Sequence, residues 1–285
     1  MRVRLTASLI LAVCAAWAAG PEIDRARKLY DSTDFDRSLR ILQAIPAKDG
    51  AAYELMGRNY YMRGEFKKAT EALEKAVAAE PGNSGYALWL GRAYGRRAET
   101  SNLFTAPGYA SKTRQCFEKA VELNPRNMEA LSDLFEYYME APGFLGGGID
   151  KAAATAGRIG QLDAAEGHSA QAKLAERKKE YGSAEEHLRR AVESAPLQAG
   201  RLVDLARFLV QRGRYQEAEQ SFAKADKIAP ARPKLLYERA ECYVKSGRNP
   251  DLARELLKRY LNSSLTAEDP PRSEAEKLLR QVKGG

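Results

Sequence analysis

The chain has 285 residues, of which 44% are hydrophobic and 29% are charged, and its formal net charge is +8. This composition is typical of an ordered protein and excludes low-complexity and collagen-like chains. Three cysteines do not make a disulfide framework, and no basic stripe interleaved with aromatic residues indicates a nucleic-acid binder.

Residues 1–19 predict a secretory signal peptide. Arg2 and Arg4 precede an apolar run over residues 5–13, which small residues follow, and the run is too short to span a membrane. We expect cleavage near residue 18 or 19 and a protein that is exported, either periplasmic or secreted. The alternative is a lipid anchor, because the four residues ending at Cys14 resemble a bacterial lipobox, although the residue before the cysteine is valine.

After residue 20 one spacing of residue types recurs: an aromatic residue, an alanine, a large apolar residue, an alanine and a proline. The copies are Phe66-Ala69-Leu73-Ala76-Pro81, Tyr181-Ala184-Leu188-Ala191-Pro196 and Tyr215-Ala218-Phe222-Ala225-Pro230. The last two copies are offset by 34 residues at every position. A period in this range with helical spacing inside it indicates a repeat solenoid.

A second apolar stripe precedes each copy, with separations of three, four and seven residues, so each unit is predicted to be two amphipathic helices. Small residues that allow these helices to approach closely are Gly57, Gly91, Ala206 and Ala240. Predicted helix stops are Pro81, Pro125, Pro196 and Pro230. Predicted left-handed caps between the two helices are Gly64, Gly213 and Gly247.

These residues resemble the tetratricopeptide repeat, whose signature runs W-x2-L-G-x2-Y, then A-x3-F, then P. The resemblance implies an all-α fold, a right-handed superhelical solenoid of helix hairpins over residues 20–265. We expect seven units, near residues 21–49, 50–83, 84–127, 128–164, 165–198, 199–232 and 233–265. Residues 266–285 are predicted to form a capping helix and tail, with the apolar face Ala275, Leu278, Leu279 and Val282.

Catalytic chemistry is not expected. The segment 167–171 is one residue from a nucleophile elbow, but that motif needs a preceding strand, and Ser169 is predicted to open a helix. His168 and His187 are the only histidines, and no Cys or His pair has metal-ligand spacing. We therefore expect no enzyme activity, no catalytic residue, no metal site and no cofactor. Cys116 and Cys242 are expected to be buried and unpaired.

Units three and four carry insertions between their two helices. Nineteen residues separate Tyr94 from Thr113, whereas nine separate Tyr60 from Ala69. The predicted edge loops span residues 101–112 and 141–148 and share an Ala-Pro-Gly-aromatic phrase; their candidate residues are Phe104, Pro107, Tyr109, Pro142 and Phe144. Long structured loops are often functional. The alternative is that these aromatic residues pack on each other and on the hairpin ends.

The outward face of the first helices is predicted to line a concave groove. In the tetratricopeptide family this face receives extended peptides or helices. The candidate groove residues are Glu54, Arg58, Tyr61, Leu88, Arg92, Glu136, Lys173, Arg207, Tyr237 and Glu241, with Val203 as a further apolar contact. A clamp for C-terminal carboxylates is not supported, because the asparagine partners of that clamp are missing.

The favoured interpretation is an exported, non-enzymatic scaffold that holds a protein or peptide partner in the cell envelope. Arg58, Arg92 and Arg207 favour an acidic segment, with Tyr61 and Tyr237 as apolar anchors. The alternative is an accessory protein that binds a small ligand or glycan through the aromatic, Gly-rich loops. A nucleic-acid partner is not expected.

Overall fold

The structure is a computed structural model and describes residues 20–230 and 232–283. Within these ranges every regular element is a helix, which confirms the predicted all-α fold. None of the described helices is long and apolar enough to cross a membrane. The predicted signal peptide and Cys14 lie outside the described residues.

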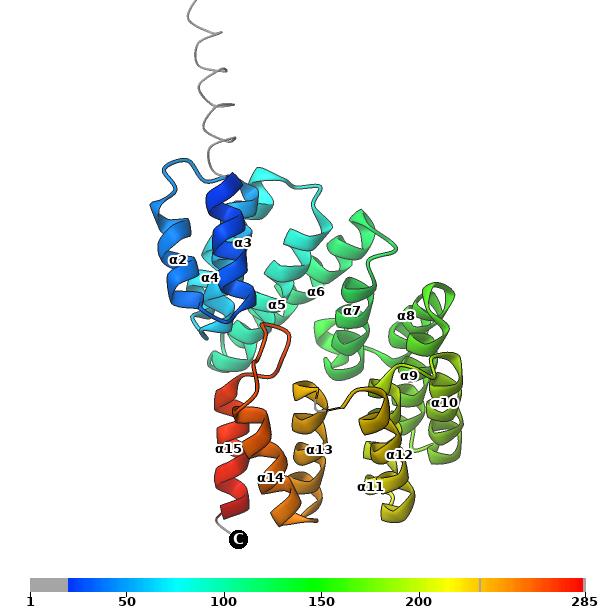
Figure 1. The fold of residues 1–285 in the computed structure, drawn as a ribbon. Coiled ribbons are helices and arrows are strands. Elements are labelled where there is room, and N and C mark those ends of the chain that lie inside the picture. The colour runs from blue at the N-terminus through cyan, green and yellow to red at the C-terminus, as the bar shows by residue number, and fades with distance from the viewer. Residues whose placement is uncertain (1–19, 231, 284–285) are drawn as a thin grey trace, which may run out of the picture. The chain divides into compact units, whose positions relative to one another are not determined.

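The helices group into two compact units, one ending at Gly148 and the other beginning at Ile149. This boundary falls inside the fourth hairpin that the sequence predicts. In the first unit residues 20–31 are helical, followed by α2 (Phe35–Ala44), α3 (Gly50–Met62), α4 (Phe66–Ala79), α5 (Ser84–Thr100), α6 (Ala106–Leu123), α7 (Met128–Glu140) and the 3₁₀ turn η1 (Gly143–Leu145) (Figure 1). The second unit comprises α8 (Ile149–Leu162), α9 (Ala164–Arg177), α10 (Tyr181–Ser194), α11 (Ala199–Gln211), α12 (Tyr215–Ile228), α13 (Pro233–Ser246), α14 (Pro250–Leu261) and α15 (Arg272–Lys283).

Consecutive helices pack as hairpins, α3 on α4 and α5 on α6 in the first unit, and α9 on α10, α11 on α12 and α13 on α14 in the second. The predicted proline stops are confirmed, because α4, α6, α10 and α12 each end two residues before their proline. Asn83 and Asn127 follow two of these prolines and cap the next helix. Their side-chain oxygens accept hydrogen bonds from the backbone nitrogens of Gly85 at 3.0 Å and Ala130 at 3.1 Å.

The predicted left-handed caps are also confirmed. Gly64 and Gly213 have φ of 75°, and Gly247 has φ of 66°. Lys179 takes the same conformation at φ 63°, at the place where the next repeat has Gly213. A side chain at this φ is strained, since Cβ approaches the following carbonyl oxygen.

Two predicted small residues do bring helices together. A Cβ on Gly57 would lie 2.9 Å from Leu73 Cδ2, and a Cβ on Gly91 would lie 2.6 Å from Phe117 Cδ1. A third close approach was not predicted: a Cβ on Gly167 would lie 2.9 Å from the backbone nitrogen of Gly160. Helices α8 and α9 therefore touch backbone to backbone.

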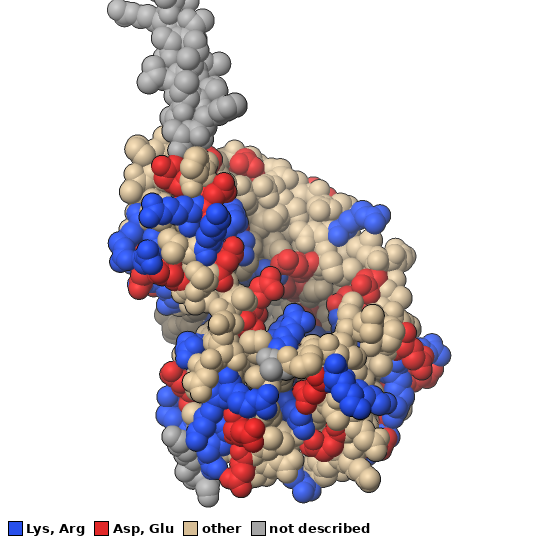
Figure 2. All heavy atoms as spheres, in the orientation of Figure 1, with Lys and Arg blue, Asp and Glu red and all other residues tan. Residues whose placement is uncertain are grey.

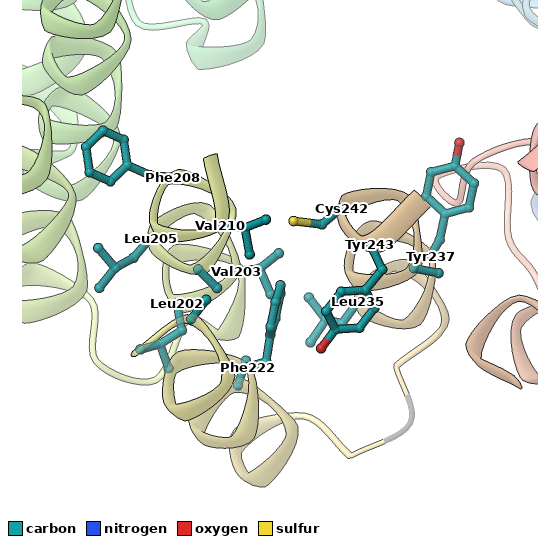
Figure 3. Packing of buried hydrophobic residues seen from close by; sticks show 14 of the residues in the cluster. Leu202, Val203, Leu205, Phe208, Val210, Phe222, Leu235, Tyr237, Cys242 and Tyr243 are labelled. Atoms are coloured by element: carbon teal, nitrogen blue, oxygen red, sulfur yellow. The ribbon is translucent and has the colours of Figure 1, made fainter. Parts of the chain in front are cut away.

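The main core of the second unit lies between α11, α12 and α13 (Figure 3). The rings of Phe222 and Tyr243 are 5.8 Å apart in an edge-to-face arrangement that aromatic pairs favour. Ala275 and Leu278 of α15 are buried in the same cluster, and Leu279 and Val282 pack against it. The predicted capping helix is confirmed.

Candidate functional site

Arg58, a candidate groove residue, is enclosed by side chains of its own unit. Its guanidinium carbon lies 4.8 Å from the ring centroid of Tyr30 and 4.5 Å from that of Trp89. Its Nη1 donates a hydrogen bond to Glu54 Oε1 at 3.3 Å. Glu54 is only 7% exposed, and burial raises its pKa more than Arg58 and Arg27 lower it. These residues join successive hairpins.

Arg92 is engaged in the same way. Its guanidinium carbon lies 4.8 Å from the Trp89 ring centroid, its Nε donates to Asp133 Oδ2 at 2.5 Å, and its Nη2 is 2.9 Å from Glu129 Oε2. Burial raises the pKa of Asp133, against the lowering by Arg92. Arg58 and Arg92, which were predicted to favour an acidic partner, thus each have acidic partners within the protein. Half-buried guanidinium groups take internal partners because a desolvated charge without one is costly.

Three apolar groove candidates are core residues. Leu88 is 3% exposed and Val203 2%, and Tyr237 packs on Tyr260 with ring centroids 5.4 Å apart. Burial raises the pKa of Tyr237 to about 12. Their predicted role as apolar contacts for a partner is wrong, because these side chains are buried among side chains of the protein itself. In Figure 3 Tyr237 points away from Phe222 on the far side of α13.

Other candidate groove and loop residues meet in the first unit, at an open cavity of about 440 Å³. It is lined by residues of α3, α5, α6, α7 and the segment after α7. Four predicted residues line it together: Tyr61, Arg92, Glu136 and Pro142. The segment after α7 is held by Tyr137, whose hydroxyl donates to the Leu145 carbonyl oxygen at 2.9 Å. Sequence analysis missed Tyr137, Glu99 and Glu140 as lining residues, although Tyr137 adjoins Glu136, Glu140 lies one helical turn from Glu136 and Glu99 lies two turns from Arg92.

The insertion in the third predicted repeat, residues 84–127, is mostly helical. Helix α5 runs to Thr100 and α6 begins at Ala106, so residues 106–112, predicted as loop, are the first turns of α6. Pro107 does not prevent this, since the first turn of a helix tolerates proline. Tyr109 is a packing residue: its ring stacks on that of Tyr94 at 6.1 Å, and the Arg97 guanidinium carbon lies 4.1 Å from its centroid.

The other aromatic residues of the insertions project into solvent. Phe104 is 95% exposed, its neighbour Leu103 90%, and Phe144 82%. Packing on the hairpin ends is thus right for Tyr109 and wrong for Phe104 and Phe144. Adjacent exposed apolar side chains such as Leu103 and Phe104 are found at interaction surfaces.

Two candidate residues of the second unit line a different cavity, of about 510 Å³, between α11, α12 and α13. Arg207 and Glu241 line it with Arg212 and Lys245. Arg207 Nη1 lies 3.3 Å from Asp204 Oδ1, and Lys245 Nζ lies 2.9 Å from Glu241 Oε1. Lys173 is exposed on α9 and does not line this cavity. On the face shown in Figure 2 basic and acidic side chains are interspersed.

The two histidines meet between α9 and α10, with their Nδ1 atoms 3.1 Å apart. Ser169 lies in the middle of α9, not in its first turn as predicted, and its hydroxyl accepts a hydrogen bond from Arg201 Nη1 at 2.7 Å. The described residues contain no group of three or more His, Cys, Asp or Glu able to hold a metal ion. Both Cys116 and Cys242 are free thiols; Cys242 is buried, and burial raises the pKa of the half-buried Cys116 to about 11.

Comparison with known proteins agrees with the fold. Family models described as tetratricopeptide repeat match residues 54–97, 169–233 and 209–282. A tetratricopeptide repeat protein of Parabacteroides merdae is 15% identical with a TM-score of 0.60, over 92% of this chain and 98% of that chain. A thermophilic protein of the same type from Thermus thermophilus is 23% identical with a TM-score of 0.52, over 70% of this chain and 98% of that one. No curated protein sequence matches.

Proposed function

Because the chain belongs to the tetratricopeptide repeat family, we propose that it is a non-enzymatic scaffold that binds a segment of a partner protein in the cavity of its first unit. Repeats of this family are generally protein-interaction modules. The observation that carries the proposal is the convergence of α3, α5 and α7, together with the segment after α7, on one open cavity.

The lining of this cavity supports side-chain recognition. Tyr61 and Tyr137 give rigid aromatic surface, and Gly95, Ala98 and Ala110 keep the floor open. A volume of about 440 Å³ lies in the range of pockets that enclose a few large side chains. Aromatic residues beside arginine are also the commonest energetic centres of protein interfaces. A partner segment lying along α5 would insert its side chains here.

A site-specific cross-link tests this function. A photo-reactive amino acid in place of Ala98 would form an adduct with the partner in cells, because Ala98 lines the cavity. The matched control is the same substitution at Ala78, which is exposed on α4 and does not line the cavity. Equal adducts from both positions, or none from Ala98, would contradict binding in the cavity.

Export is the second part of the proposal. It is supported by Arg2 and Arg4 before the apolar run over residues 5–13. The intact mass of the mature protein is expected to fit cleavage near residue 18 or 19, and the protein to be found in the periplasm or the medium. A lipid-modified Cys14 would favour the anchored alternative, and a retained Met1 would contradict export.

A small ligand or glycan is the second candidate for the same cavity. The observation that favours it is that the cavity is open, of suitable size and flanked by Tyr61 and Tyr137. A thermal-shift screen separates the two, since a small ligand stabilises the isolated protein by mass action. A scaffold is expected to show no shift until its protein partner is added.

A further inference from the structure

The charges that line the cavity of the first unit are unequal. Three carboxylates, those of Glu99, Asp133 and Glu140, line it with two guanidinium groups, those of Arg92 and Arg96, and the Glu129 carboxylate adds a fourth negative charge beside Arg92. Both arginines are already paired inside the protein. Arg92 is held by Asp133 and Glu129, and Arg96 by Glu99. An entering segment therefore meets a field of negative sign.

The remaining wall of the cavity is apolar. Ala98, Phe117 and Leu145 line it, and the chain continues directly from the rim into the exposed side chains of Leu103, Phe104 and Phe144. Apolar surface beside carboxylates suits a segment in which large apolar side chains alternate with cations. The aliphatic stem of a lysine or arginine covers apolar wall, while its charged head reaches the carboxylates at the rim.

From this combination we infer that the occupant of the cavity is a basic amphipathic protein segment, with a large apolar side chain and a Lys or Arg within one turn of it. The inference rests on the function proposed above and reverses the acidic partner expected from the sequence. A phospholipid surface is the other class of partner for exposed Leu and Phe side chains. It is disfavoured because the rim carboxylates Glu99 and Glu140 repel anionic headgroups.

Selection from a random 12-residue peptide library displayed on phage tests this inference. Clones are sorted by whether they bind the protein and lose binding in Ala98→Trp, which fills the cavity, while keeping it in the exposed control Ala78→Trp. Among these cavity-dependent clones we expect Lys and Arg to exceed Asp and Glu beside the apolar positions. In Glu99→Gln/Glu140→Gln their affinity is expected to fall about fivefold, because two rim charges are lost.

The outcomes separate the inference from the proposed function. Cavity-dependent clones that are acidic or uncharged would overturn the basic partner and leave peptide binding in place. A library that yields no cavity-dependent clone would overturn both. Sedimentation of the protein with phosphatidylglycerol vesicles, lost in Phe104→Ser, would also overturn the inference in favour of a membrane partner.

Discussion

The guanidinium carbon of Arg58 lies 4.5 Å from the ring centroid of Trp89, a residue of the following hairpin. The guanidinium carbon of Arg92 also lies 4.8 Å from the Trp89 ring centroid, so one indole contacts two arginine side chains. Cation–π contacts of this kind are strongest where water is partly excluded. The candidate groove residues Arg58 and Arg92 thus stabilise the packing between neighbouring repeats.

Replacing Arg58 is therefore expected to destabilise the first unit. Arg58→Ala removes two cation–π contacts and leaves buried Glu54 without its ion-pair partner, and we expect a loss of about 2 kcal/mol in the free energy of unfolding. Urea unfolding followed by Trp89 fluorescence measures it. The control, Arg40→Ala at an exposed position, should change stability by less than about 0.5 kcal/mol. Equal losses of stability in both variants would contradict a stabilising role for the contacts of Arg58.

Gly57 tests the close packing of α3 on α4. Because a Cβ at this position would press on Leu73, Gly57→Ala is expected to cost about 1–3 kcal/mol of stability even though alanine favours helices. Gly82→Ala is the matched control, since no atom lies within 4 Å of its added Cβ. Thermal unfolding by circular dichroism measures both, and an unchanged midpoint for Gly57→Ala would show that the helices separate freely.

Lys179 offers a change in the opposite direction. It holds φ at 63° where the following repeat has Gly213. Lys179→Gly removes the strain of a left-handed backbone conformation at a residue with a side chain. Glycine also raises the entropy of the unfolded chain, which offsets part of this stabilisation, so we expect the free energy of unfolding to rise by about 0.5–1 kcal/mol. Gly213→Ala should lose a similar amount. If both changes act in the same direction, the cap geometry does not govern stability here.

The histidine pair predicts a pH dependence of the second unit. Burial lowers the pKa of His187, and His168 and Arg190 lower it further, against a smaller raising effect of Glu186. A lowered pKa in the folded state means that the unfolded chain takes up the proton first as the pH falls. The stability contributed by neutral His187 is complete above about pH 6.5 and is lost as the pH falls through the lower folded pKa.

Unfolding midpoints at pH 7.5 and 5.5 check this sign. The midpoint of the wild-type protein is expected to fall more over this interval than that of His187→Gln. Carboxylates with raised pKa, such as Glu176 and Glu238, titrate equally in both proteins and cancel in the comparison. Identical pH profiles would show that the half-buried imidazole of His187 is not the titrating group.

The exposed tip between α5 and α6 is expected to serve binding and not folding. Leu103→Ser/Phe104→Ser alters side chains that are 90% and 95% exposed, so the unfolding free energy should stay within about 0.5 kcal/mol. Binding of a cavity-dependent peptide is expected to weaken about tenfold, measured by fluorescence anisotropy. Leu197→Ser, an equally apolar position that is 83% exposed in the second unit, is the control. The same loss of affinity in the control would contradict a specific role of Leu103 and Phe104 in binding.

Much of the fold followed from local pattern. The prolines at 81 and 230, the glycines at 64 and 213 and the close approach at Gly57 were each predicted, because a stop, a cap or a contact within a hairpin depends on residues a few turns apart. The cavity was predicted only in part. Tyr61 and Glu136 do line it, but Leu88, which stands four residues before Arg92, is buried.

Spacing along the chain thus decided that this protein consists of helices, where most of them stop and which small residues let them touch, since these properties arise from steric and hydrogen-bonding limits within each repeat. Only the tertiary structure decided which of the side chains that look alike in the sequence are exposed. Phe104 and Tyr109 stand five residues apart in one insertion, yet one is in solvent and the other stacks on Tyr94. Charge on Arg92 is visible in the sequence, but its neutralisation by Asp133, 41 residues away, depends on how α5 and α7 meet.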